Sequence, residues 1–235
     1  MPNYFIGIMC GTSLDSLDIS LLRDSNTSKI ELFKSYRLDN NLVQMINVCK
    51  KNNKNQKLFR EIDDKVTEFI IVSLYKFLKN QNKDIEAIGF PGITILHNPS
   101  KRISKTLGNC QKIANHFKIK VVGDFRLSDM KSGGQGAPLA PYFHNYISVN
   151  KKKFINILNL GGFGNFTGMT NNKLVAFDTG PANYIYDGLM REKYKMDYDK
   201  SGKIAKNGKV DNNALLKLLS HQYFKILPPK STGFE

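Results

Sequence analysis

The chain has 235 residues, with 35 Lys and Arg against 20 Asp and Glu, so its formal net charge is +15. Hydrophobic residues make up 41% and charged residues 23% of the sequence. This composition excludes a disordered chain and predicts one large domain or two small ones. No window approaches the roughly 18–20 consecutive apolar residues of a membrane span. The first residues, MPNYFIGIM, lack the basic region and cleavage site of a signal peptide.

The basic excess is spread through the chain. Lysines stand beside asparagines in the runs KKNNKN (50–55), NQNK (80–83), NKKK (150–153) and NNK (171–173). A nucleic-acid surface requires basic residues clustered on one element. We therefore expect solvated loops and no nucleic-acid partner, with DNA binding kept as an alternative. The three cysteines, Cys10, Cys49 and Cys110, are far apart, which argues against a disulfide framework and favours a reducing cytoplasm.

The first part of the chain predicts three strands joined by tight turns, followed by alternating helices and strands. The expected strands are Tyr4–Met9, Asp18–Leu22, Ile30–Tyr36, Ile85–Phe90 and Ile119–Val122, and the expected helices are 57–79, 106–117 and Pro141–Ser148. The helix at 57–79 has apolar residues at helical spacing and an acidic first turn. Residues Gly123–Pro141, rich in Gly, Asp and Pro, indicate a long functional loop.

A second unit is predicted to begin near Lys152. Its expected strands are Phe154–Leu160, Asn165–Met169 and Lys173–Phe177, and its expected helices are Pro181–Lys195 and 211–220. Both units open with an apolar strand, a Gly-containing turn and a second strand, IGIMCGTSLD and ILNLGGFGNFT. Backbone N–H groups in such turns bind anions. Two hairpins of this kind are suited to hold a polyphosphate.

Three polar segments carry candidate chemistry. Residues 11–18, GTSLDSLD, offer hydroxyls, backbone amides and carboxylates for phosphate and Mg²⁺, although an ordinary hairpin turn would look the same. Asp124 follows a strand, where α/β sheets place ligand groups, and Arg126 suits a carboxylate, although the two would also pin a loop as a pair. Asp178 stands between a strand and a helix, where it would be a general base or a helix N-cap.

Several chemistries lack their motifs. No GK[ST] is present for a Walker A loop, and no GxSxG for a serine nucleophile. The four histidines (His97, His116, His144 and His221) have no HExxH context, so a zinc site is not expected.

Taken together, the segments resemble the anhydro-N-acetylmuramic acid kinase family. The matching segments are GIMCGTSLDSLD (7–18), VVGDFRLSD (121–129), GGQGAPLAP (133–141), LNLGGFGNFT (158–167), FDTGPAN (177–183) and PPKSTG (228–233). The resemblance implies an α/β chain with the two-lobed, RNase H-like fold of actin-like ATPases and sugar kinases. Residues 1–148 would form the first lobe and residues 149–235 the start of a second, truncated lobe.

The resemblance also implies the reaction. Family members use ATP and Mg²⁺ to open 1,6-anhydro-N-acetylmuramic acid with water and to phosphorylate O6, in the cytoplasmic recycling of peptidoglycan. It implies the anhydro sugar and ATP as partners, no membrane, and a homodimer.

Residue roles are carried over by position. Asp178 would be the catalytic base, and Asp15 would hold Mg²⁺. The phosphate-binding residues would be Gly11, Thr12, Ser13, Leu14, Asp15, Ser16, Leu17, Asp18, Gly161, Gly162 and Asn165. The sugar-binding residues would be Thr94, Asp124, Arg126, Gly180 and Asn183.

The chain departs from the family pattern in three respects. The family's His-Gly-Gln-Thr segment is Pro91-Gly92-Ile93-Thr94 here, and Ser16 and Ala182 replace glycines. The chain also ends where the family continues, and the absent part would include the adenosine-binding segment. A remnant without activity, or a sugar-binding module of the same fold, is therefore the alternative hypothesis.

Overall fold

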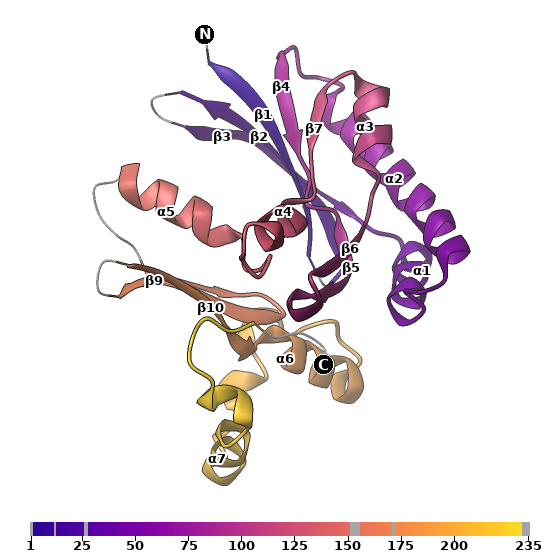
Figure 1. Ribbon diagram of the computed structural model, residues 1–235. Coiled ribbons are helices and arrows are strands. Elements are labelled where there is room, and N and C mark those ends of the chain that lie inside the picture. Colours follow the sequence, from indigo (N-terminus) through magenta and orange to yellow (C-terminus); the bar gives the residue numbers. More distant parts are fainter. Residues whose placement is uncertain (1, 12, 26–27, 151–155, 171–172, 232–235) are drawn as a thin grey trace. The chain divides into compact units, whose positions relative to one another are not determined.

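The protein is described by a computed structural model that covers residues 2–11, 13–25, 28–150, 156–170 and 173–231 (Figure 1). The chain divides into two compact units, Met1–Gly136 and Ala137–Glu235. The expected boundary lay at residue 148, so this division assigns the helix expected at Pro141–Ser148 to the second unit. None of the described helices combines the length and the apolar character that crossing a membrane requires.

Unit 1 is a mixed sheet covered by helices on one face. Its strands are β1 (Asn3–Cys10), β2 (Ser16–Asp24), β3 (Lys29–Arg37), β4 (Ile85–Gly89), β5 (Ile93–Asn98), β6 (Ile103–Leu107) and β7 (Lys120–Val122). Its helices are α1 (Asn40–Lys51), α2 (Gln56–Leu78), α3 (Cys110–Phe117) and α4 (Phe125–Lys131), with a short turn η1 (Pro99–Lys101). Helices α1, α2 and α3 lie together on one side of the sheet (Figure 1).

The main sheet has the strand order β3-β2-β1-β4-β7. β1, β2 and β3 form an antiparallel meander, whereas β4 and β7 run parallel to β1. Ile6 and Ile8 of β1 and Ile19 of β2 are at most 2% exposed. They pack with Val66 and Ile70 of α2 in one hydrophobic core. Buried and exposed residues alternate along β1 and β2; β1 had been predicted from its apolar run and β2 from its alternation.

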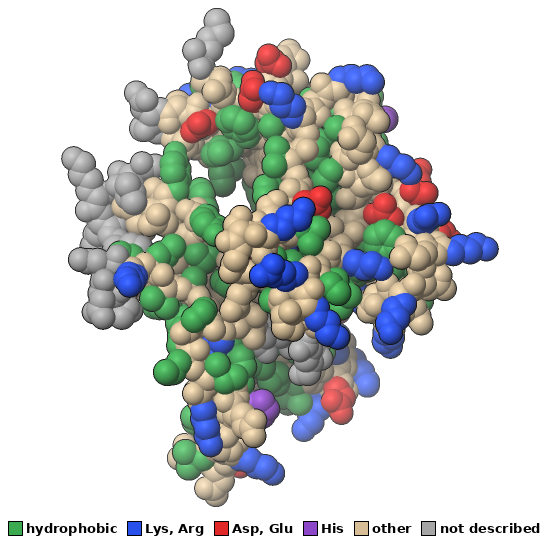
Figure 2. Space-filling view, in the orientation of Figure 1, with side chains coloured by type: hydrophobic (Ala, Val, Ile, Leu, Met, Phe, Trp, Pro, Cys, Tyr) green, Lys and Arg blue, Asp and Glu red, His purple; other side chains and the backbone are tan. Residues whose placement is uncertain are grey.

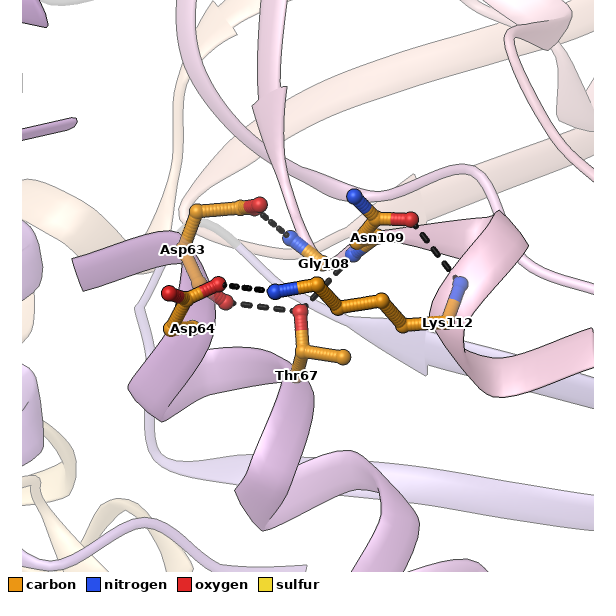
Figure 3. Close-up of polar contacts among 6 residues, drawn as sticks. All are labelled: Asp63, Asp64, Thr67, Gly108, Asn109 and Lys112. Carbon is orange, nitrogen blue, oxygen red and sulfur yellow. Dashed lines mark hydrogen bonds and ion pairs between the residues drawn. The ribbon is translucent and has the colours of Figure 1, made fainter. Parts of the chain in front are cut away.

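A polar cluster joins α2 to the turn between β6 and α3 (Figure 3). The Asp63 carboxylate accepts a hydrogen bond from the Gly108 amide at 2.7 Å, and the Thr67 hydroxyl accepts one from the Asn109 amide at 2.9 Å. Gly108 has a φ of +100°, and a Cβ there would lie 2.4 Å from the Phe90 ring. The turn therefore requires glycine and is fixed by groups on α2.

Two expected elements of unit 1 are wrong in part. The helix expected at 106–117 begins at Cys110, because Ile103–Leu107 pairs with β5 as a strand. The segment Gly123–Pro141 contains helix α4 and is not one long loop. The sequence prediction also lacked α1 and β5. α1 nevertheless has a clear start, since Asp39 caps it by accepting from the Leu42 amide at 2.8 Å.

Unit 2 opens with a second antiparallel meander. Its strands are β8 (Ile157–Leu160), β9 (Phe163–Thr170) and β10 (Lys173–Pro181), in the order β10-β9-β8. Its helices are α5 (Ala140–Asn150), α6 (Asn183–Leu189) and α7 (Asn212–Leu219), with short turns η2 (Met190–Tyr194), η3 (Lys200–Gly202), η4 (Ala205–Asn207) and η5 (Gln222–Lys225). The beginning of the strand expected at Phe154–Leu160 lies outside the described residues.

Basic and acidic side chains are mixed over α2 and α3 on the face drawn in Figure 2. Lys112 of α3 pairs with Asp64 of α2, and Lys65 pairs with Glu61 within α2. This part of the surface lacks the uniform positive charge that nucleic-acid binding requires.

We predict that Asp63→Ala lowers the free energy of unfolding by about 1–3 kcal/mol, because the Gly108 amide loses its acceptor in a partly buried turn. Urea denaturation followed by circular dichroism measures the change. Asp64→Ala is the matched control, since it removes only an exposed ion pair worth about 0–1 kcal/mol. Equal effects of the two substitutions would contradict the role given to Asp63.

Candidate functional site

The carboxyl ends of β1, β4 and β7 lie side by side in unit 1. Gly7 of β1 pairs with Gly89 of β4, which pairs with Val122 of β7, and the three strands are parallel. The segments after these strands, Gly11–Asp15, Pro91–Thr94 and Gly123–Arg126, therefore leave the same edge of the sheet. Ligands of open α/β sheets bind at this kind of edge.

The first candidate phosphate loop is anchored by its apolar residues. Leu14 and Leu17 are 2% and 0% exposed, so their side chains belong to the core and only their backbone is available to a ligand. The Ser13 hydroxyl donates to Asp15. The carboxylate of Asp18 accepts from the hydroxyls of Ser16, at 3.0 Å, and Ser35, at 2.6 Å. Thr12, which was also expected to bind phosphate, lies outside the described residues.

Arg126 joins two of the segments at this edge. Its Nε donates to the Thr94 hydroxyl at 3.2 Å, and its Nη1 donates to the Gly136 carbonyl at 2.8 Å. The structure thus brings together two of the predicted sugar-binding residues. Asp124 precedes α4 in a left-handed conformation and makes no side-chain cap. Its negative charge raises the pKa of the Cys110 thiol, although burial contributes more to that shift.

His97 contributes a polar group to which the sequence analysis gave no role in the site. Its Nε2 lies 3.0 Å from the Gln135 carbonyl, and its Nδ1 is buried without a hydrogen-bond partner in the described part of the chain. Burial, followed by the nearby Arg126 charge, lowers the pKa of the imidazole. The neutral ring therefore donates from Nε2 to the loop that ends unit 1.

In unit 2, the Gly161–Gly162 turn is held by the start of α6. The amides of Ala182 and Tyr184 donate to the Gly162 carbonyl at 2.9 and 3.0 Å. The Asn183 amide donates to the Gly161 carbonyl at 3.0 Å, and its side chain donates to the Leu160 carbonyl at 2.8 Å. Asn183, predicted to bind sugar, thus fixes the turn that was predicted to bind phosphate.

Asp178 lies in a row of polar residues across the three strands of unit 2. It pairs with Asn165 of β9, which pairs with Asn159 of β8. Residues directly opposite one another point to the same face of a sheet. Asn159 was not predicted from the sequence, because only the strand register places it beside Asn165.

The helix N-cap reading of Asp178 is wrong. Asp178 is inside β10, which continues to Pro181, and α6 begins at Asn183. Pro181 is consequently the last residue of a strand and not the first of a helix. The expected helix start was displaced because the strand shifts register between Asp178 and Gly180 and extends further.

The comparisons with known proteins concern the chain as a whole. Residues 3–235 match the family model described as anhydro-N-acetylmuramic acid kinase. The chain belongs to this family. The proteins named anhydro-N-acetylmuramic acid kinase from Pseudomonas syringae pv. tomato and Shewanella sp. strain ANA-3 are both 36% identical to it. These alignments cover 100% and 99% of this chain and 66% and 65% of the relatives.

A third relative of the same name, from Bacillus cereus strain 03BB102, is 36% identical, with 99% of this chain and 65% of that protein covered. The chain thus spans just under two thirds of the length of these relatives. The solved structure of a protein described as a sugar kinase, from Cytophaga hutchinsonii, has a TM-score of 0.35 and 14% identity, over 92% of this chain and 70% of that one. That likeness is too weak to establish a common fold.

Residues Pro91–Thr94 stand where the resemblance leads one to expect His-Gly-Gln-Thr. Ile93, which replaces the glutamine, is 2% exposed and packs in the hydrophobic core. The hydroxyl of Thr94 accepts from Arg126 Nε. At this edge, Pro91 and Ile93 thus offer no polar side chain to a ligand, whereas Thr94 and Arg126 do.

Acidic groups for a metal are sparse in both units. In the described residues, no three His, Cys, Asp or Glu side chains are arranged to hold a metal ion. Asp15 is exposed and lies in the loop after β1, next to the Ser13 hydroxyl. Mg²⁺ in kinase sites usually takes one or two carboxylates and completes its shell with phosphate oxygens and waters. The Asp15 carboxylate fits that requirement.

We predict that His97 makes the chain less stable at acidic pH. Its pKa is lowered in the folded chain from an ordinary value of 6.5, so the stability given by the neutral ring is present above that value. This stability is lost as the pH falls through the lower folded pKa. In urea titrations between about pH 7 and pH 5, His97→Gln should show a smaller decrease than the wild type. His116→Gln, at an exposed position, should behave as the wild type, and an unchanged slope in His97→Gln would contradict the prediction.

Proposed function

We propose that the protein is an ATP-dependent kinase that opens 1,6-anhydro-N-acetylmuramic acid with water and phosphorylates O6, giving N-acetylmuramic acid 6-phosphate in cell-wall recycling. Membership of the family supports this reaction. Within the chain, the residue that carries the proposal is Asp178, which lies opposite Asn165 in the sheet. The backbone N–H and C=O of Asp178 are both hydrogen-bonded.

In the proposed reaction, Asp178 accepts a proton from the water that attacks the anomeric carbon. The bond between that carbon and O6 breaks, and its electron pair stays on O6. O6 then attacks the γ-phosphorus of ATP, and ADP leaves. A positioned carboxylate base accelerates such a reaction by about 10²–10⁴-fold. Phosphoryl transfer depends mainly on the positioning of the reactants and on the neutralisation of phosphate charge.

The proposed phosphate contacts come from the two glycine-containing turns. Gly11–Asp18 would provide amides and hydroxyls from unit 1, and Gly161–Gly162 with Asn165 would do so from unit 2. Asp15 would hold Mg²⁺, which neutralises phosphate charge when it is bound with ATP. The carboxylate and neighbouring hydroxyl at Asp15 support that assignment.

The proposed sugar contacts come from Thr94, Asp124, Arg126, Gly180 and Asn183. A guanidinium is suited to the lactyl carboxylate of the sugar, because its planar fork matches a carboxylate. The contact of Arg126 with Thr94, at 3.2 Å, supports a shared role for these two residues.

We further propose that both units are RNase H-like lobes and that the second is incomplete in this chain. Unit 1 extends a three-strand meander by the two parallel strands β4 and β7, and unit 2 opens with a meander of the same order. The family length supports the proposal, since the relatives extend beyond the matched part. We place the protein in the cytoplasm, in keeping with three cysteines that form no disulfide. The homodimer stays a prediction.

We predict that Asp178→Asn lowers turnover by about 10²–10⁴-fold and leaves ATP binding unchanged, because the amide cannot accept the proton from water. ADP formation with the anhydro sugar and Mg²⁺ measures turnover, and calorimetric titration measures ATP binding. Asp197→Asn, at an exposed position in unit 2, is the matched control. Full turnover in Asp178→Asn would refute the base assignment.

A second candidate function is a sugar-binding module without kinase activity. The burial of Ile93 in place of a polar residue, and the match to only 65–66% of the relatives, favour it. Calorimetric titration with ATP and with the anhydro sugar separates the two candidates. The kinase binds both ligands, whereas the module binds the sugar alone.

A further inference from the structure

Asp178 is held by a segment far along the chain. We define the brace as residues Tyr223–Lys230, which include most of η5 and the turn after it. The Asp178 amide donates to the Lys230 carbonyl at 3.0 Å, and the Asp178 carbonyl accepts from the Tyr223 hydroxyl at 2.6 Å. Both backbone groups of Asp178 are therefore bonded to the brace.

These two bonds determine how Asp178 faces Asn165. In an antiparallel pair, the N–H and C=O of one residue point to the same side of the strand. Since both groups of Asp178 bond to the brace, they point away from β9. Asp178 and Asn165 consequently form a non-hydrogen-bonded pair, the type in which opposite side chains come closest.

The brace is closed on itself by Lys230. Its ammonium donates to the Tyr223 carbonyl at 3.1 Å and lies 4.5 Å from the centre of the Tyr223 ring. It also lies 5.9 Å from the ring of Phe177, the residue before Asp178. Cation–π contacts of this kind add attraction in partly buried sites. The ends of the brace are thus tied to each other and to β10.

The brace also packs on the irregular end of β10. Gly180 has a φ of +129°, and a Cβ at that position would lie 3.3 Å from the Phe224 ring. Strand irregularities of this type re-aim the side chains next to them. The Tyr223 hydroxyl stays protonated at neutral pH, since burial, followed by the Asp178 charge, raises the pKa of Tyr223 to about 12.

From these contacts we infer that Tyr223 is a positioning residue for the catalytic base: its hydroxyl fixes the peptide group of Asp178 and thereby the direction of the carboxylate. The inference rests on the proposed function, in which Asp178 activates water. A catalytic group displaced by about 1 Å can lose 10²-fold in rate. Because the Tyr223 hydroxyl bonds to Asp178 and not to Gly180, we expect the loss of this hydroxyl to affect the chemical step more than the binding of ATP or of the sugar.

The test compares Tyr223→Phe with Tyr75→Phe. The first substitution removes one hydroxyl and keeps the ring, and the second makes the same change on α2, where Tyr75 is 61% exposed. We expect Tyr223→Phe to lower kcat about 10- to 100-fold with KM for both substrates within about twofold. We also expect faster hydrogen exchange at the Asp178 amide, measured by mass spectrometry or NMR. Tyr75→Phe should match the wild type in each measurement.

The outcomes separate this inference from the proposed function. Turnover that is lost in Asp178→Asn but unchanged in Tyr223→Phe overturns the role of Tyr223 alone. Turnover that persists in Asp178→Asn overturns the base and, with it, the positioning role. If the wild-type chain shows no turnover, that result counts against the proposed function. In that case the hydrogen-exchange rate of the Asp178 amide still tests Tyr223, and a rate in Tyr223→Phe equal to that of the wild type overturns its positioning role. If Tyr223→Phe raises KM as much as it lowers kcat, the substitution has destabilised the fold in general, and the positioning role of Tyr223 is also overturned.

Discussion

The burial of α2 against β1 and β2 is the constraint on which unit 1 depends. Val66 and Ile70 of the helix are 0% exposed, and Ile6 and Ile8 of β1 are 2% exposed. Each such side chain contributes about 1.5–3 kcal/mol on burial. A shift of β1 by one residue would turn Gly7 inward and these isoleucines outward, so the register is fixed. The fixed register aligns the carboxyl ends of β1, β4 and β7, which carry the candidate ligand groups of this unit.

In unit 2, the first strand of the meander buries less apolar surface than its counterpart in unit 1. Leu158 and Leu160 of β8 are 56% and 61% exposed, although they occupy the place in the meander that Ile6 and Ile8 occupy in unit 1. In the described part of unit 2, β8 pairs only with β9, whereas β1 pairs on both sides. Backbone hydrogen bonds each contribute only about 0.5–1.5 kcal/mol net. The position of Asp178 consequently depends on several specific polar contacts and not on a large apolar core.

Patterns within one element were enough to predict much of the fold. The apolar run of β1, the alternation in β2 and the helical spacing in α2 indicated those elements. The prediction failed at Gly108, which was placed inside an expected helix. Gly108 followed by the capping Asn109 is a local signal that a helix starts there, and the prediction overlooked it. That the residues before it form a strand follows from the pairing of β6 with β5, which is not a local property.

The candidate site could be predicted only where its residues stand in short motifs. Asp178 and Arg126 were proposed in this way, and the contact of Arg126 with Thr94 joins two motifs 32 residues apart. Tyr223 reaches Asp178 across 45 residues, and it bonds to the main chain, not to the carboxylate. Any residue type offers the same carbonyl to such a donor, so the sequence around Asp178 carries no trace of its partner. Contacts that bond to the backbone of Asp178 are therefore specified by the path of the chain, and a residue such as Tyr223 is identified only once that path is known.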